Sequence, residues 1–151
     1  MVLNALFRWA FRRSPWVGLL QVGGCNGCTI EVVDALTPRF DIERFGAVYK
    51  STPRHVDILL VTGCVTVGSV NFLKRIYDQI PDPKVIVAVG TCAVSGGIFT
   101  NRVESASSYA VLGGIDRVIP VDIYVAGCPP KPEAIIDALL EAAKLLAEKR
   151  Q

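Results

Sequence analysis

The amino-acid sequence predicts an α/β domain with a doubly wound, mostly parallel sheet. Short apolar runs, typical of strands buried on both faces, alternate along the chain with segments of helical periodicity. No internal repeat or linker interrupts the alternation, so one layered domain is expected. The runs that we expect to form the main strands cover residues 16–22, 57–62, 84–89 and 118–125.

The first thirteen residues are expected to form an amphipathic helix. Its apolar side chains recur at helical spacing, and Arg8 and Arg12 fall on the opposite side. Such a helix could cap the core of its own domain, but we predict that residues 1–13 dock on a partner or membrane subunit. Ser14-Pro15 then ends the helix, and residues 14–151 form the α/β domain. The apolar residues are Leu3, Leu6, Phe7, Ala10 and Phe11.

The remaining elements follow in order, in a layout that resembles flavodoxin. A glycine-rich turn leads to a short helix over residues 30–36, then to a helical turn at 40–45 and a short strand at 47–49. Pro53 and His55 are placed in a loop, where a lone histidine is usually solvated. A helix over residues 70–80 ends before Pro81, residues 93–117 are expected to form a long loop, and residues 133–149 form the closing helix.

Composition excludes several classes of protein. The formal net charge of +2 gives no electrostatic footprint for nucleic acid. Hydrophobic residues make up 51% of the chain, yet no run reaches the roughly eighteen that a membrane span needs, so we expect partner subunits to cover the apolar excess. The arginines near the start are unlike a secretory signal, so the five cysteines predict metal or redox chemistry in the cytoplasm.

The cysteines all follow predicted strands. Cys25 and Cys28 lie on a glycine-rich turn after the first strand, whereas Cys64, Cys92 and Cys128 each follow one of the next three. Because the carboxyl ends of parallel strands meet at one edge of a sheet, the thiols are expected to converge there. The sequence therefore predicts a ligand-binding site built from sulfur.

The spacing of the thiols favours an iron–sulfur cluster over two alternatives. A dithiol oxidoreductase would need only the Cys25–Cys28 pair, and a zinc ribbon usually has a second Cys-x-x-Cys, which this sequence lacks. Single cysteines on glycine- or proline-constrained turns suit a 4Fe–4S cluster, because backbone N–H groups can approach the sulfides. No dinucleotide fingerprint or Walker lysine is present.

Three motifs resemble those of a known family. They are Cys-Asn-Gly-Cys-Thr-Ile-Glu (residues 25–31), Gly-Thr-Cys-Ala (90–93) and Gly-Cys-Pro-Pro-Lys-Pro-Glu (127–133). Together they resemble the small subunits of membrane-bound energy-converting nickel–iron hydrogenases and the equivalent cluster subunit of respiratory complex I. The resemblance runs from about residue 13 to the end, and the Cys-x-x-Cys places the chain on the hydrogenase-like side.

The resemblance implies a set of ligands and a role. Cys25, Cys28, Cys92 and Cys128 would hold one 4Fe–4S cluster next to a catalytic large subunit. The motif does not use Cys64, which we expect to be a neighbour of the cluster rather than a ligand, although the residues alone leave it open. Glu31 is expected in the first turn of its helix. Two interpretations are open: the helix dipole stabilises the carboxylate there, or Glu31 takes part in the proton transfer that the resemblance implies.

The implied function is electron transfer within a membrane-associated complex. The chain would accept electrons from a ferredoxin-like multi-cluster subunit and pass them to a nickel–iron site, with ion pumping by membrane-embedded subunits. This places it on the cytoplasmic face of the membrane. Thr29 stands where these hydrogenases often have aspartate, so a sulfane-sulfur-reducing or quinone-reducing complex remains an alternative. A soluble dithiol oxidoreductase and a zinc-stabilised adaptor are the more distant ones.

Overall fold

Five parallel strands form the central sheet, which confirms the predicted fold class. The structure is a computed structural model that describes residues 9–100 and 109–149. The strand order is β2-β1-β3-β5-β7, and every neighbouring pair in this sheet is parallel. The strands are β1 (Trp16–Gln21), β2 (Val48–Tyr49), β3 (Ile58–Thr62), β5 (Val85–Val89) and β7 (Ile123–Val125).

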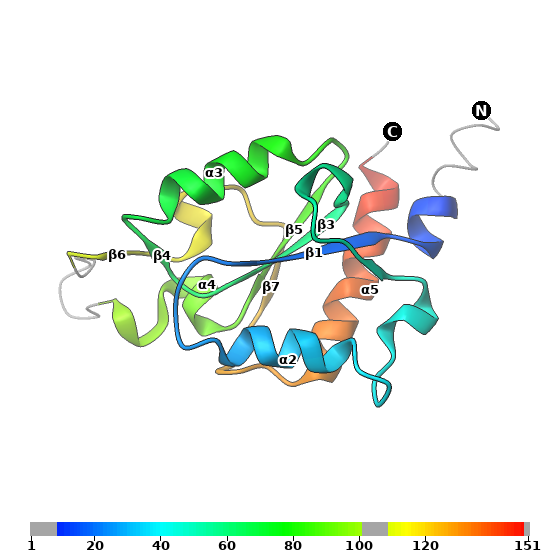
Figure 1. Cartoon of the computed structure of the whole chain (residues 1–151), viewed down its shortest axis with the longest axis horizontal. Coiled ribbons are helices and arrows are strands. Elements are labelled where there is room, and N and C mark those ends of the chain that lie inside the picture. The colour runs from blue at the N-terminus through cyan, green and yellow to red at the C-terminus, as the bar shows by residue number, and fades with distance from the viewer. Residues whose placement is uncertain (1–8, 101–108, 150–151) are drawn as a thin grey trace.

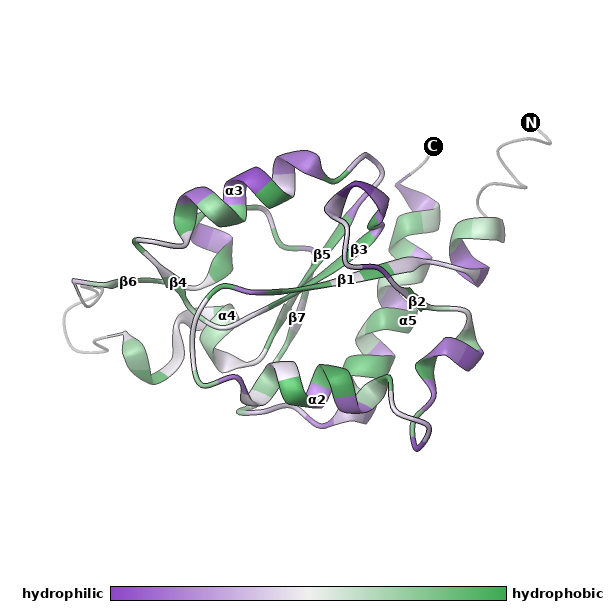
Figure 2. Ribbon diagram, viewed as in Figure 1, coloured by the Kyte–Doolittle hydropathy of each residue, from purple (hydrophilic) through white to green (hydrophobic). Residues whose placement is uncertain are grey.

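Helices cover both faces of the sheet (Figure 1). Helices α2 (Gly27–Ala35) and α5 (Pro132–Glu148) pack on one face, and α3 (Val70–Gln79) and α4 (Thr91–Ser95) pack on the other. Every residue of β3 and β5 is buried, as expected for strands covered on both sides. Figure 2 shows the consequence, with apolar strands in the middle and the polar side of α3 facing outward.

The segment between residues 93 and 117 is more ordered than the sequence predicts. It contains the end of α4 and a short strand, β6 (Val111–Gly113), which pairs antiparallel with β4 (Val65–Thr66). Strands of two or three residues have too few positions to show any periodicity, so the sequence did not reveal them. The structure also has 3₁₀ helices at Ile42–Phe45, Pro53–His55, Gly97–Phe99 and Ile115–Arg117.

The last strand is shorter than predicted. It begins at Ile123 rather than at Val118, and a 3₁₀ helix precedes it. Pro120 lies between the two and has no N–H to donate to a sheet ladder, which explains the late start. His55, placed in a loop by the sequence, lies in a 3₁₀ turn with its ring 5.7 Å from that of Trp16. That turn precedes β3, so His55 is at the edge of the sheet opposite to the cysteines.

The N-terminal segment is described from Trp9 onward. Residues 9–13 are helical, whereas Leu3, Leu6 and Phe7 lie outside the described residues. Phe11 packs against the core beneath α2 and α5, and Trp9 is exposed. The described end of the segment therefore contacts its own domain, and docking on a partner or membrane subunit stays a prediction. Among the described helices, none has the length and apolar composition to cross a membrane.

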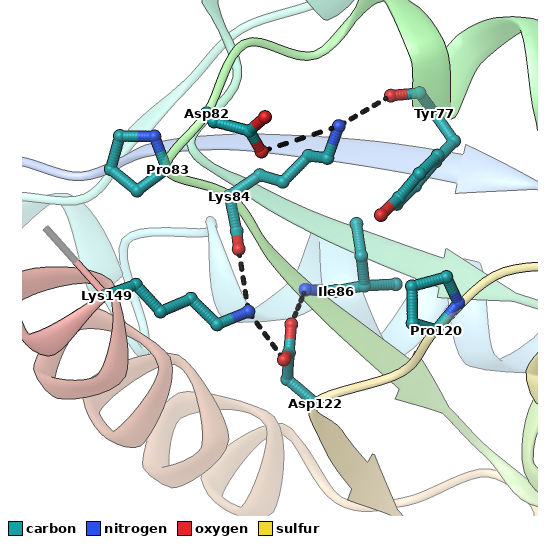
Figure 3. A pocket seen from close by; sticks show the side chains of 8 residues that line it. All are labelled: Tyr77, Asp82, Pro83, Lys84, Ile86, Pro120, Asp122 and Lys149. Atoms are coloured by element: carbon teal, nitrogen blue, oxygen red, sulfur yellow. Dashed lines mark hydrogen bonds and ion pairs between the residues drawn. The ribbon is translucent and has the colours of Figure 1, made fainter.

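An ionic network closes the amino edge of the sheet, on the side away from the cysteines (Figure 3). Lys149 Nζ donates to Asp122 Oδ1 at 2.6 Å and to the Lys84 carbonyl at 3.0 Å. Lys84 Nζ donates to the carbonyls of Tyr77 and Ile80, near the end of α3. Both ammonium groups thus have protein acceptors, so the network joins α3, β5, β7 and α5 in a structural role.

Asp57 gives the fold a pH dependence that can be measured. Its Oδ2 accepts a hydrogen bond from the Trp16 N–H at 2.9 Å, and burial raises the pKa of this carboxyl above its ordinary value. The folded state therefore holds a proton that the unfolded state has lost, and stability falls as pH rises from about 3.8 through the folded pKa. In the Asp57→Asn variant of the full chain, we expect the free energy of unfolding, measured with urea, to show no such decline with pH. An equal decline in both proteins would contradict the assignment.

Candidate metal centre

The structure brings the four predicted ligand cysteines to the carboxyl edge of the sheet. Cys25 follows β1, Cys28 is the second residue of α2, Cys92 is the second residue of α4, and Cys128 follows β7. Cys25 and Cys128 are exposed, whereas Cys28 and Cys92 are half-buried. The convergence expected from the strand ends is thus present, with two thiols facing outward.

The thiols are close enough to influence one another. Cys25, Cys28 and Cys92 line one shallow hollow between the glycine-rich turn and the ends of β1 and β3. Burial and, to a lesser extent, the neighbouring Cys92, Cys128 and Cys25 together raise the pKa of the Cys28 thiol to about 11. Burial, followed by the charges of neighbouring thiols, also raises the pKa of the Cys92 thiol. All four sulfurs therefore belong to one site, and a positive centre there would relieve their repulsion.

Glycines allow the turns of the site to approach each other closely. Gly90 has a φ of +88°, and a Cβ at this position would overlap Cys28 Sγ. Gly63 has a φ of +86°, and its Cβ would overlap the carbonyl oxygen of Gly23. Only glycine adopts such backbone angles readily, so these positions fix how near the thiol-bearing turns can lie.

Hydrogen bonds also hold the Cys92 turn against the Cys128 turn. The Thr91 N–H and the Thr91 hydroxyl both donate to the carbonyl of Gly127, at 2.8 and 3.0 Å. The Gly90 N–H donates to the carbonyl of Val125 at 2.8 Å. Cys92 and Cys128 thereby keep a fixed separation, although Thr91 and Gly127 are 36 positions apart in the sequence.

The donor set fits an iron–sulfur cluster. Among residues 9–100 and 109–149, no three potential donors converge closely enough to hold a single metal ion. A four-iron cluster is a larger body held by four cysteine thiolates, so its ligands can be spread around a hollow.

Cys64 lies beside these thiols and, like Cys128, does not line the hollow. It follows β3, is 2% exposed, and burial raises the pKa of its thiol. Its position contributes to the raised pKa of Cys92, so the two thiols are neighbours. The expectation that Cys64 lies near the site is therefore confirmed, while its absence from the ligand set remains a prediction.

Replacement of Cys64 by alanine is expected to leave the iron and sulfide content of the purified complex unchanged. The buried thiol behaves as a small hydrophobic side chain, so its removal should cost stability of about 1 kcal/mol through the cavity it leaves. Iron and acid-labile sulfide analysis against wild type provides the check. Loss of iron in Cys64→Ala would make this thiol a ligand.

Glu31 is not where the sequence placed it. Helix α2 begins at Gly27, so its first turn ends at Ile30 and contains no acidic residue. The expected stabilisation of Glu31 by the helix dipole is wrong, because that effect falls off within the first turn. Glu31 is half-buried in the second turn, on the helix that carries Cys28.

Two threonines of the site were not identified from the sequence. The Thr29 and Thr62 hydroxyl oxygens are 2.8 Å apart and joined by a hydrogen bond, and both residues line the hollow with the cysteines. Thr62 is the last residue of the otherwise apolar strand β3. The available sequence signal for this pair was the hydroxyl of Thr62 at a core position of a buried strand.

Comparisons with known proteins identify a family and several relatives of this chain. Residues 25–142 match the model of the NADH ubiquinone oxidoreductase 20 kDa subunit family. A probable membrane-bound hydrogenase subunit, mbhJ of Pyrococcus furiosus, is 51% identical over 90% of this chain and 78% of its own length. Subunit K of the chloroplastic NAD(P)H-quinone oxidoreductase of Nephroselmis olivacea is 43% identical over 98% of this chain, which spans only 59% of that protein.

Solved structures agree with the fold. A chain of the membrane-bound sulfane sulfur reductase, an archaeal respiratory membrane complex, superposes with a TM-score of 0.75 and 38% identity, over 93% of this chain and 76% of that one. A chain of an NAD⁺-reducing nickel–iron hydrogenase has a TM-score of 0.62 at 23% identity, over 85% and 92%, and supports the fold alone. The family match covers most of the residues, including all the thiols. The chain therefore belongs to the NADH ubiquinone oxidoreductase 20 kDa subunit family, whose members are subunits of oxidoreductase complexes.

Proposed function

We propose that this chain is an electron-transfer subunit that holds one 4Fe–4S cluster through Cys25, Cys28, Cys92 and Cys128. The observation that carries the proposal is the convergence of these four thiols, from three segments of the chain, at one edge of the sheet. When bound, such a cluster supplies one-electron redox chemistry. The chain has no catalytic apparatus of its own in this proposal: its residues fix the position of the cluster, limit its contact with water and set its potential.

The exposure of the ligands supports a partner subunit over the site. Cys25 and Cys128 are exposed, so this chain alone leaves one side of the thiol site open to solvent. On α2, beside the site, the apolar side chains of Ile30 and Val33 are 61% and 49% exposed. A catalytic large subunit that covers this surface would bury the apolar side chains and exclude water from the thiols.

Further partners follow from the relatives. We propose that a ferredoxin-like multi-cluster subunit delivers the electrons and that membrane-embedded subunits anchor the assembly, with this chain in its peripheral arm on the cytoplasmic face. The membrane-bound hydrogenase relative and the membrane-bound sulfane sulfur reductase chain support the membrane association in this proposal. The chain's contribution is the same in each case, because it holds the cluster and presents it to the large subunit.

The large subunit determines the overall reaction. The 51% identity to a probable membrane-bound hydrogenase subunit favours proton reduction at a nickel–iron site with coupled ion pumping. The 38% identity to a chain of the sulfane sulfur reductase supports sulfur reduction as the second candidate. Quinone reduction, as named for the chloroplastic relatives, is the third.

Metal analysis of the native complex tests the proposal. The complex containing this chain is purified anaerobically, and iron, sulfide, nickel and zinc are counted before hydrogen evolution is assayed with a low-potential donor. Iron and sulfide with nickel and hydrogen evolution support the hydrogenase. Iron and sulfide without nickel keep the electron-transfer role and move the reaction to sulfur or quinone. Zinc, or dithiol activity from an iron-free chain, would overturn the proposal.

Glu31 is the residue that we propose for proton transfer at the interface with the large subunit. It lies one turn after Cys28 on α2 and is half-buried. In Glu31→Gln, the cluster should stay intact while turnover falls by about 10²-fold, the lower end of the contribution of a positioned acid–base group. Turnover at the wild-type rate with an intact cluster would end this assignment, and Glu43→Gln on the distant 3₁₀ helix is the control.

A further inference from the structure

Thr62 occupies a position where the fold requires only an apolar side chain. It closes β3, whose residues Ile58 and Leu60 point into the core beneath α2 and α5, and it follows them in the same alternation. It is 1% exposed and is the one buried polar side chain in the described part of the protein. A valine has nearly the same shape, so packing alone does not explain the hydroxyl.

The hydroxyl of Thr62 is paired with that of Thr29. The two oxygens are 2.8 Å apart, and either one can be the donor. Thr29 lies in the first turn of α2, directly after Cys28, so the bond joins the end of β3 to the helix that carries a ligand thiol. In the described parts of the chain, neither hydroxyl makes a second side-chain hydrogen bond.

The pair has one more hydrogen than its own bond uses. Two hydroxyl groups carry two hydrogens, and a single hydrogen bond between them consumes one. Whichever threonine donates within the pair, the other keeps a hydrogen for an outside acceptor. The buried partner also orients and polarises the donor, which strengthens an outward hydrogen bond in a site of low dielectric constant.

Among the side chains that line the hollow, most of the acceptors outside the pair are sulfur. Thr29 and Thr62 line it together with Cys25, Cys28 and Cys92. The remaining side-chain acceptors in its lining are the amides of Gln21 and Asn26. A hydroxyl that donates to a thiolate or sulfide stabilises negative charge there, and hydrogen bonds of this kind help to set the potential of iron–sulfur clusters.

We propose that the Thr29–Thr62 pair donates its remaining hydrogen to a sulfur of the thiol site and thereby raises the reduction potential of the bound cluster. The inference rests on the proposed function and adds to it a tuning element made from this chain's own residues. The donated hydrogen bond stabilises the reduced form, which carries one more negative charge than the oxidised form. In this proposal Thr29, which follows Cys28 directly, is the outward donor, and the buried Thr62 donates to Thr29 and orients it.

The test is an EPR-monitored redox titration of the intact complex carrying Thr29→Val, Thr62→Val or both. Thr29→Val is expected to shift the midpoint potential of the cluster to a more negative value. Thr62→Val should shift it less, because Thr29 keeps its own hydrogen and loses only the partner that orients it. The double variant should shift it no further than Thr29→Val, because the outward donor is already lost in that single variant. Thr29→Ser, which keeps the hydroxyl, should hold the wild-type potential. Thr37→Val, whose hydroxyl bonds to the Asp34 carbonyl at the other end of α2, is the control and should also leave it unchanged.

A second measurement follows the hydrogen itself. After exchange into D₂O, pulsed EPR of the reduced cluster should show one strongly coupled exchangeable deuteron fewer in Thr29→Val than in wild type. An unchanged potential and deuteron count in Thr29→Val, with the cluster signal at full intensity, would overturn the inference and leave the cluster assignment standing. Absence of any 4Fe–4S signal in the wild-type complex would instead overturn the proposed function. Thr29 is half-buried, so its variant gives an answer even if Thr62→Val fails to fold.

Discussion

Serine at position 28 is expected to remove the cluster from the complex. Burial and the neighbouring Cys92, Cys128 and Cys25 raise the pKa of the Cys28 thiol, which therefore lies among the other three. A serine hydroxyl is a poorer ligand and is not deprotonated near neutral pH. Cluster retention should therefore fall by at least the roughly 10–100-fold that loss of an outer-shell partner costs. Iron and sulfide analysis of the purified complex measures the loss.

Cys64→Ser is the matched control for this change. It makes the same replacement at the neighbouring thiol, which does not line the hollow. Because Cys64 is buried, the variant should lose some thermal stability but keep its iron. Full iron content in Cys28→Ser, or equal losses in both variants, would contradict the ligand set.

Alanine at position 90 is expected to have an effect nearly as large, without touching any ligand. A Cβ on Gly90 would overlap Cys28 Sγ, and the φ of +88° with ψ of 159° belongs to a region that only glycine adopts readily. The backbone strain alone costs about 1–3 kcal/mol. To relieve the overlap, the Cys28 thiol or the start of α4 must move, so iron content should fall together with thermal stability.

Gly68→Ala provides the comparison. No atom lies within 4 Å of a Cβ at Gly68, so this change should alter neither the iron content nor the melting temperature appreciably. The two variants separate the specific fit of Gly90 from the general effect of glycine replacement. A Gly90→Ala complex that melts and binds iron like the wild type would show that the turn tolerates a side chain there.

The main strands and the convergence of the cysteines could be predicted because each rests on a strong local signal. β5 is an unbroken apolar run and β3 is apolar up to Thr62, and parallel strands have their carboxyl ends at the same edge. Knowing that the strands are parallel neighbours was therefore enough to predict that the motif cysteines lie together. By contrast, β4 and β6 are too short to show periodicity, and their pairing depends on contacts between distant segments.

What the sequence analysis placed wrongly or missed at the site also depends on features that have no local sequence signal. Glu31 was expected in the first turn because the start of α2 was inferred from the apolar residues Ile30 and Val33, whereas the helix begins at Gly27. Helix starts of this type lack a side-chain cap, since Asn26 at the N-cap makes no such hydrogen bond, so the sequence gives little sign of them. The Thr29–Thr62 pair joins residues 33 positions apart and has no local signature.

A density map of the complex, purified and vitrified without oxygen, tests the central claim most directly. We predict continuous density for a four-iron cluster joined to the sulfurs of Cys25, Cys28, Cys92 and Cys128, with the Cys64 sulfur unattached and the surface around Ile30 covered by a larger subunit. A single metal ion, a Cys25–Cys28 disulfide, or a cluster held by Cys64 in place of one of the four would contradict the account.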